Sequence, residues 1–354
     1  MKIGIYNPYF DSLGGGERYC LTLASHWAGL HHGVAVFWDD KNILKNAENR
    51  FKIDLSRVKV VQNIFRGRNI LKKALLSKNY DLIFFLSDGS IPLTFAKKNI
   101  LHFQSPFPSA GGRNLWNTVK LQRFGAVVCN SGFTKRHIDR DFNVDASVIY
   151  PPVAVNQFAA RGKQNIILSV GRFHPYKKQK ELAGLFQQLR KDLVGWRLYL
   201  AGGLLEQDRQ YFEEVKRCAA GSDIVLWPNA SFERLRDLYG KATIYWHGAG
   251  YEQSEEKTPE ALEHFGITTI EAMASGCIPI VYVAGGQREI VKDGENGLLW
   301  RTPKELIEKT KKVIDDKKLQ ESFRREATNR AKDFDEKRFC EAFDRLLESM
   351  RASG

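Results

Sequence analysis

The stretch that decides the fold is KIGIYNPYFDSLGGGERYCLTLASHWAGLHHGVAVFWDD, residues 2–40. Its apolar run at 2–7 predicts a β-strand, the glycines at 14–16 interrupt the chain, and an amphipathic stretch of helical length follows. A second strand is predicted at 34–40. A strand, a helix and a strand in this order are typical of a βαβ unit, whose two strands are parallel.

The same alternation continues along the chain. In the first half, further strands are predicted at 58–62, 81–87, 99–104, 126–131 and 147–152. In the second half, strands are predicted at 165–171, 197–203, 224–229, 243–248, 277–283 and 297–300. Repeated βαβ units favour parallel sheets covered by helices on both faces, with ligands at the carboxyl ends of the strands.

The length of the chain favours two domains, because 354 residues exceed the size at which one core usually stops growing. Pro151 and Pro152 precede a polar stretch, which predicts a linker. We therefore expect an α/β protein of two Rossmann-like, doubly wound parallel-sheet domains that face each other across a cleft. The expected divisions are a first domain at 1–155, a second domain at 156–330, and a helical tail at 331–354 that packs back towards the first domain.

Composition excludes several classes of protein. Hydrophobic residues make up 43% and charged residues 27%, as in folded globular proteins. The five cysteines are odd in number and lack CxxC spacing, so neither a disulfide framework nor a zinc site is expected. No signal peptide precedes the first strand and no apolar run is long enough to span a bilayer, which predicts a cytoplasmic protein.

The positive charge is concentrated in the first half. Of the net charge of +13, residues 1–150 contribute +10, from 21 lysines and arginines against 11 acidic residues. The densest part is 50–78, where nine cationic residues face Asp54 alone. This stretch is either a solvated face or a patch that binds an anionic membrane surface, because apolar residues alternate with lysines in RGRNILKKALLSK. No nucleic-acid-binding module accompanies the charge, so no nucleic acid partner is expected.

Two carboxylates flank a turn in EHFGITTIEAMASGCIPIV, residues 263–281. Gly266 permits a tight turn into a short helix, whose amino terminus suits a phosphate. Glu263 precedes the helix and Glu271 lies about a turn inside it. Carboxylates accept hydrogen bonds from hydroxyl groups in pairs, as a sugar would offer them. The simpler alternative is a pair of capping or solvated charges.

Two cations follow a strand in SVGRFHPYKKQK, residues 169–180. Arg172 and Lys177 lie five positions apart beyond the expected strand end at Gly171. Fixed cations there could hold a diphosphate and stabilise the charge that develops on a leaving phosphate. Surface charge beside a strand end is the alternative.

These segments together resemble the retaining glycosyltransferases of family 4, which have the GT-B fold. The pattern of a glutamate, seven residues and a glutamate, followed by AMASGCIPIV, is similar to that family's signature. Further resemblances are GRFHPYKK, AGGQREIVKDGENGLLW, VVCNSGFTKRHI and NPYFDSLGGGERY, in family order along the chain. The GGGER and EHFGI segments look most like the eukaryotic lipid-linked oligosaccharide mannosyltransferases and their bacterial relatives.

The resemblance implies that the domain at 1–155 is the acceptor side and that the domain at 156–330 binds the nucleotide sugar. It also implies a role for each site residue. Glu263 is expected against the donor sugar and Glu271 against the nucleotide ribose, while Arg172 and Lys177 hold the diphosphate and neutralise it as it leaves. His102 corresponds to a histidine that faces the reacting sugar in the family. The implied catalytic residues are Arg172, Lys177, Glu263 and His102, and the implied donor-binding residues are Gly16, Arg172, Lys177, Glu263, Phe265, Gly266, Ile267, Thr268 and Glu271.

The implied reaction is metal-independent transfer of a hexosyl residue, with retention, from a nucleotide-diphosphate sugar to a glycan or lipid-linked acceptor. The subfamily resemblance favours GDP-mannose as donor, and no cofactor is expected. A lipid-linked acceptor would place the protein peripherally at the inner face of the membrane. The alternatives are a sugar-nucleotide epimerase and an inactive sugar-nucleotide-binding protein of the same fold. An oxidoreductase is disfavoured, because NPYFDSL separates the first strand from the glycines and Tyr19 replaces the third glycine of GxGxxG.

Overall fold

The computed structural model describes residues 1–66, 69–108, 110–189 and 192–352. The chain divides into two compact units, one of Met1–Pro152 together with the segment from Glu336 onward, and one of Val153–Asp335. The chain therefore leaves the first unit at Pro152, three residues before the expected boundary at 155, and returns to it at Glu336 rather than at 331.

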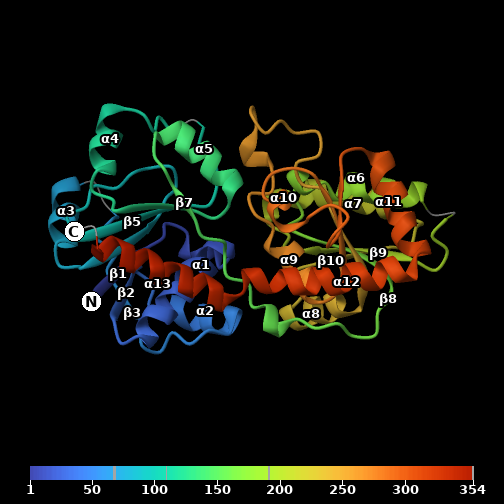
Figure 1. The fold of residues 1–354 in the computed structure, drawn as a ribbon, viewed down its shortest axis with the longest axis horizontal. Coiled ribbons are helices and arrows are strands. Elements are labelled where there is room, and N and C mark those ends of the chain that lie inside the picture. The colour runs from blue at the N-terminus through green and yellow to red at the C-terminus, as the bar shows by residue number, and fades with distance from the viewer. Residues whose placement is uncertain (67–68, 109, 190–191, 353–354) are drawn as a thin grey trace. The chain divides into compact units, whose positions relative to one another are not determined.

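The first unit contains a seven-stranded parallel sheet in the order β3-β2-β1-β4-β5-β6-β7 (Figure 1). Its strands are β1 (Lys2–Tyr6), β2 (Gly33–Phe37), β3 (Lys59–Val61), β4 (Leu82–Leu86), β5 (Lys98–Phe103), β6 (Ala126–Cys129) and β7 (Ser147–Val148). Its helices are α1 (Gly15–Gly29), α2 (Ile43–Phe51), α3 (Ile70–Ser77), α4 (Leu115–Leu121), α5 (Gly132–Phe142) and α13 (Glu336–Ala352). Residues 67 and 68 of the basic stretch lie outside the described residues.

Strand β4 shows why both faces of this sheet are covered. In its sequence LIFFL every side chain is buried, and successive side chains point to opposite faces. Phe84 packs into the core that contains Tyr19 and Trp27 of α1, whereas Phe85 packs into the core that contains Phe142 of α5. An unbroken apolar strand is typical of a parallel sheet buried between two helical layers.

Helix α13 completes the first of these cores. It packs beside α1, as Figure 1 shows, and carries Phe339 and Phe343 into edge-to-face contact with Tyr19. Both phenylalanines are buried, at 3% and 0% exposure. Buried aromatic side chains of this size contribute roughly 1.5–3 kcal/mol each. The last helix is thus an integral part of the first unit.

The second unit contains a six-stranded parallel sheet in the order β10-β9-β8-β11-β12-β13. Its strands are β8 (Gln164–Val170), β9 (Arg197–Gly202), β10 (Ile224–Pro228), β11 (Ala242–His247), β12 (Ile278–Tyr282) and β13 (Leu298–Trp300). Its helices are α6 (Gln179–Gln188), α7 (Arg209–Ala219), α8 (Phe232–Lys241), α9 (Ile267–Ala274), α10 (Gln287–Ile290), α11 (Pro303–Asp315) and α12 (Lys317–Ala331).

Every strand predicted from the sequence overlaps a strand of one of the two sheets, so the prediction of two doubly wound parallel sheets is confirmed. The strand order of each sheet reverses once, between β1 and β4 in the first and between β8 and β11 in the second. At such a switch point the loops that follow the two strands run to opposite faces and leave a crevice, where α/β proteins bind their ligands.

Candidate active site

The candidate site of the second unit begins at the switch point, where β8 ends. Gly171 and Arg172 follow this strand at the carboxyl edge of the sheet. A Cβ on Gly202, which ends β9 with a φ of +151°, would lie 1.9 Å from the carbonyl oxygen of Gly171. Only glycine fits there, and this close approach fixes the backbone from which Arg172 projects.

Lys177 ends a short 3-10 helix, Pro175–Lys177. The ring nitrogen of His174 accepts the backbone N–H of Tyr176 at 3.3 Å and caps this turn. Burial lowers the pKa of His174, and the charges of Arg172 and Lys177 lower it further. The two predicted cations are therefore close enough to act on one ring, and the capped turn holds Lys177 in place.

Arg172 is oriented by an aspartate that the sequence did not single out. The Oδ2 atom of Asp208 lies 3.5 Å from the Arg172 Nε atom, and Asp208 is only 6% exposed. A buried carboxylate needs a positive partner, which Arg172 supplies. Asp208 lies in the segment that connects β9 to α7, so two neighbouring strand ends contribute to this ion pair.

Glu263 is paired with a lysine and a histidine. Its Oε2 atom accepts hydrogen bonds from Lys177 Nζ at 2.6 Å and from His247 Nε2 at 3.0 Å. Burial alone would raise the pKa of Glu263, but Lys177 and His247 together outweigh it and hold the pKa well below its usual range. The carboxylate is therefore ionised throughout the physiological pH range.

His247 is a second residue that the sequence reading missed. It ends β11, is 3% exposed, and contacts Glu263 through Nε2. Burial lowers the pKa of His247 and outweighs the opposing effect of Glu263, so the ring is neutral at neutral pH and donates through Nε2. The signal available in the sequence was a polar residue at the carboxyl end of an apolar strand.

Glycines hold the backbone of Glu263 in position. The N–H of Gly286 donates to the carbonyl oxygen of Glu263 at 2.8 Å. A Cβ on Gly285, where φ is +58°, would lie 2.1 Å from the same oxygen. The glycine pair in AGGQREI is thus required for the segment before α10 to approach Glu263 closely.

Helix α9 starts as the sequence predicted, from a glycine. Gly266 has a φ of +124°, and a Cβ there would lie 2.8 Å from Gln287 Nε2. Thr268 accepts the hydroxyl of Tyr245 at 2.8 Å, and Ile267 is the first residue of the helix. Phe265 is 3% exposed and packs in the interior, so its side chain supports the turn.

Glu271 lies on the same helix and accepts the hydroxyl of Tyr239 at 3.0 Å. Burial raises the pKa of the neighbouring Tyr245, and Glu263 and Glu271 raise it further. Both carboxylates therefore lie close enough to Tyr245 to affect its pKa. The structure brings the four charged residues of the prediction, Arg172, Lys177, Glu263 and Glu271, to the carboxyl ends of β8 and β11.

The other two predicted residues belong to the first unit. Gly16 lies in the first turn of α1, and a Cβ there would lie 2.6 Å from Gln104 Oε1. His102 is fully buried and stacks on Tyr19 at 4.0 Å between ring centroids. Its Nδ1 lies 3.1 Å from the carbonyl oxygen of Val128, and burial lowers its pKa to about 3. His102 is thus a neutral interior residue of this unit, and its catalytic role stays a prediction.

The arrangement in the second unit suits an anionic, hydroxyl-rich ligand. Two cations and a helix amino terminus can bind phosphate groups, and ionised carboxylates can accept hydrogen bonds from hydroxyls. Within the described residues, no three histidine, cysteine or acidic side chains gather as metal ligands. In the same residues, no helix is long and apolar enough to cross a membrane.

Comparison with known families agrees with this chemistry. Residues 153–330 match the model of the glycosyl transferases group 1 family, and residues 13–157 match the model of glycosyltransferase family 4. The chain belongs to the group 1 glycosyl transferases. The family predicted from the sequence is confirmed.

Several relatives are named for mannosyl transfer. The chain is 30% identical over 225 residues to a GDP-Man:Man(3)GlcNAc(2)-PP-Dol alpha-1,2-mannosyltransferase of Caenorhabditis elegans, covering 57% of this chain and 45% of that one. The Dictyostelium discoideum protein of that name is 25% identical over 63% of this chain and 47% of its own. The chain thus spans about half the length of these relatives. An uncharacterized glycosyltransferase of Methanocaldococcus jannaschii is 23% identical over 91% of both chains.

Solved structures support the fold. A glycosyltransferase from Rickettsia africae superposes with a TM-score of 0.79 at 16% identity, over 99% of this chain and 98% of that one. Anabaena HepE, solved in complex with UDP and glucose, gives a TM-score of 0.74 at 17% identity, over 99% of this chain and 100% of its own. The GT-B fold is therefore confirmed.

Proposed function

We propose that this chain is a retaining, metal-independent hexosyltransferase that moves a sugar from a nucleotide-diphosphate sugar to a glycan or lipid-linked acceptor. The observation that carries the proposal is the Lys177–Glu263 ion pair, which joins segments 86 residues apart. A diphosphate gains negative charge as the sugar leaves it, and Arg172 and Lys177 would stabilise that charge. Glu263 would accept hydrogen bonds from the hydroxyls of the donor sugar.

GDP-mannose is the proposed donor, because several curated relatives carry it in their names. The test is a thermal-shift screen with GDP-, UDP- and ADP-linked sugars, since a ligand that binds only the folded form raises the melting temperature. The largest shift is expected with GDP-mannose. A larger shift with a UDP-linked sugar would move the assignment to that donor, and no shift with any of them would contradict the proposal.

Kinetics can test the role of Lys177. Lys177→Ala should lower kcat more than it weakens donor binding, because charge on the phosphate grows as the bond breaks. An equal loss of both quantities would contradict this role. Incubation of the donor without an acceptor distinguishes the epimerase alternative, since an epimerase would convert the donor sugar under these conditions.

We further propose that the basic stretch 50–78 holds the protein on an anionic membrane surface at the inner face of the membrane. Helix α3 supports this, because Ile70, Leu71 and Leu75 are 58%, 69% and 57% exposed beside Lys72 and Lys78. Apolar residues among cations are typical of a helix that lies in a lipid interface. The protein should sediment with anionic liposomes at low salt and much less with neutral ones.

A further inference from the structure

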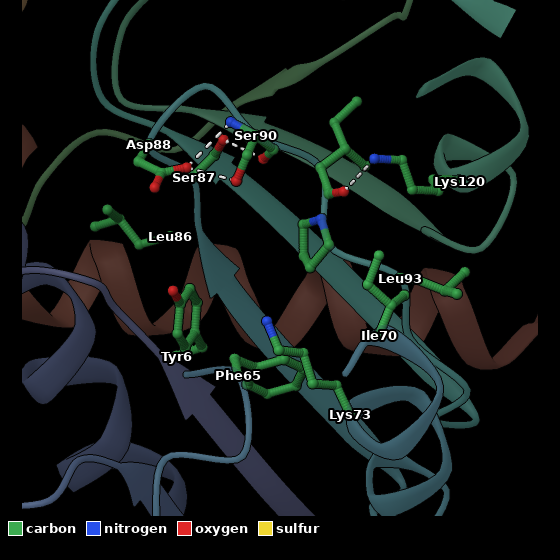
Figure 2. A pocket seen from close by; sticks show the side chains of 12 residues that line it. Tyr6, Phe65, Ile70, Lys73, Leu86, Ser87, Asp88, Ser90, Leu93 and Lys120 are labelled. Carbon is green, nitrogen blue, oxygen red and sulfur yellow. Dashed lines mark hydrogen bonds between the residues drawn. The ribbon is translucent and has the colours of Figure 1, made fainter. Parts of the chain in front are cut away.

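A pocket lies in the first unit. Its volume is about 220 Å³, and it opens at the carboxyl ends of β1 and β4, the switch point of the first sheet. Tyr6 from the end of β1 and Leu86 from the end of β4 line it on one side (Figure 2). A crevice of this origin is where a doubly wound sheet binds a ligand.

Two lysines reach this pocket from different helices. Figure 2 shows the ammonium group of Lys73, from α3, directed towards the middle of the pocket between Tyr6 and Leu93. Lys120, from α4, donates to the carbonyl oxygen of Ile91 at 2.7 Å on the opposite wall. Among the described residues, no ion pair joins either lysine to a carboxylate. The positive charge of the pocket is therefore available to an anion.

The opposite end of the pocket is suited to hydroxyl groups. The Oδ1 atom of Asp88 accepts hydrogen bonds from the backbone N–H of Ser90 at 3.1 Å and from its hydroxyl at 2.6 Å. The other carboxylate oxygen of Asp88 is left to accept a hydrogen bond from a hydroxyl group of the ligand. Ser87 also lines this end of the pocket. The carboxylate makes this end unfavourable for a phosphate, so the phosphate and the hydroxyl groups of one ligand would be separated along the pocket.

The rim beside the lysines is apolar. Ile70 lines the pocket and is 58% exposed, and Leu71 and Leu75 continue along the exposed surface of α3. Helix α4, which supplies Lys120, exposes Leu115 and Trp116 at 80% and 77%. Since pockets for whole drug-sized ligands measure about 300–1,000 Å³, this one accommodates a head group and leaves an attached chain outside.

We propose that this pocket binds the head group of a lipid phosphate, with the phosphate between Lys73 and Lys120 and the hydrocarbon chain along the exposed apolar residues of α3. This inference rests on the proposed function in one respect: the bound lipid would be the acceptor, with its hydroxyl-bearing end towards Asp88. Binding of the head group itself does not depend on transfer. Free inorganic phosphate carries the same kind of charge, but it could not make the apolar contacts along α3.

The test is calorimetric titration of the full chain with octyl phosphate below its micelle concentration. Inorganic phosphate and tetraethylene glycol monooctyl ether, which is uncharged, are the comparators. Octyl phosphate should bind about tenfold more tightly than either, because a charge-assisted hydrogen bond and apolar contacts both contribute. Equal affinity for inorganic phosphate would overturn the lipid assignment, and equal affinity for the uncharged amphiphile would overturn the phosphate site.

Substitutions locate the binding. Lys73→Glu should weaken octyl phosphate binding at least about tenfold. Lys72→Glu, on the same helix but outside the pocket lining, makes the same change in net charge and should stay within about twofold. An equal loss in both variants would show a diffuse basic surface and overturn the proposal. Lys73→Met and Lys120→Met, which remove the charge and keep the apolar stem, provide variants that retain the packing if Lys73→Glu does not fold.

Nucleotide binding separates this inference from the proposed function. GDP and UDP titrations should give the same affinity in Lys73→Met as in the unsubstituted protein, because Lys73 is not among the residues to which donor binding is assigned. Failure of the unsubstituted protein to bind either nucleotide would contradict the proposed function, whereas the octyl phosphate titrations alone decide the pocket.

Discussion

Removal of the Lys177 ammonium group should destabilise the second unit measurably. In the structure Lys177 Nζ lies 2.6 Å from Glu263 Oε2, and the two side chains are 32% and 17% exposed. In Lys177→Met the carboxylate would retain the hydrogen bond from His247 but lose its cation. A carboxylate in this environment without a cation is costly, because burial disfavours its charged form.

The magnitude follows from the exposure of the pair. Breaking a fully buried ion pair costs about 3–5 kcal/mol, and a solvent-exposed pair contributes about 0–1 kcal/mol. The intermediate exposure of this pair gives an expected loss of about 2 kcal/mol at pH 7. For a domain of this size the melting temperature should fall by about 4–8 °C.

The loss should depend on pH in one direction. The pKa of Glu263 in the folded protein lies below its value in the unfolded chain, so the pair contributes its full stability above the unfolded pKa. This stability is lost as the pH falls through about 4.3, the ordinary glutamate value, towards the lower folded pKa. The difference in melting temperature between the unsubstituted protein and Lys177→Met should therefore be full at neutral pH and shrink in acid.

The assay is thermal unfolding followed by circular dichroism for Lys177→Met, Glu263→Gln and the double variant. Because the two residues are in contact, the double variant should lose less stability than the sum of the single losses. Lys180→Met is the matched control: its partner Glu214 is 2.8 Å away, but the pair is 50% and 31% exposed, so its loss should be much smaller than that of Lys177→Met. Additive losses, or a control loss as large as that of Lys177→Met, would refute the reasoning.

Three further predictions concern the same unit. Glu271→Ala should weaken nucleotide binding about tenfold or more with a smaller effect on kcat, as measured by titration and kinetics, if Glu271 holds the ribose. Asp208→Asn should lower kcat with little change in melting temperature, because the ion pair that orients Arg172 is lost; an unchanged kcat would remove Asp208 from the site. Gly202→Ala should destabilise the protein by more than about 4 kcal/mol in denaturant unfolding, because its Cβ would overlap the Gly171 carbonyl.

The sequence was sufficient to predict the fold because its apolar runs are short, frequent and separated by helical patterns. The run at 81–87 was predicted as a strand, and the structure shows that every side chain of its LIFFL part, β4, is buried. The predicted strands also indicated where the charged site residues would lie, because segments that come after parallel strands gather at one edge of the sheet.

The partners of these residues could not be predicted, because they depend on tertiary contacts between distant segments. His247 and Asp208 are ordinary polar residues in sequence, and only the strand order places them beside Glu263 and Arg172. The direction of the His102 side chain could not be predicted either. One residue of strand register decides whether a side chain points into the core or away from it, and the sequence around NILHFQ does not fix that register.

The return of α13 to the first unit has a consequence for biosynthesis. A ribosome makes the whole of Val153–Asp335 before it makes Phe339 and Phe343, which close the core against Tyr19. The second unit, whose residues are contiguous, can therefore finish folding while the first unit, which was begun earlier, still exposes apolar surface. The usual vectorial order, amino-terminal domain first, is reversed, and the nascent amino-terminal half is the species that a chaperone would need to shield.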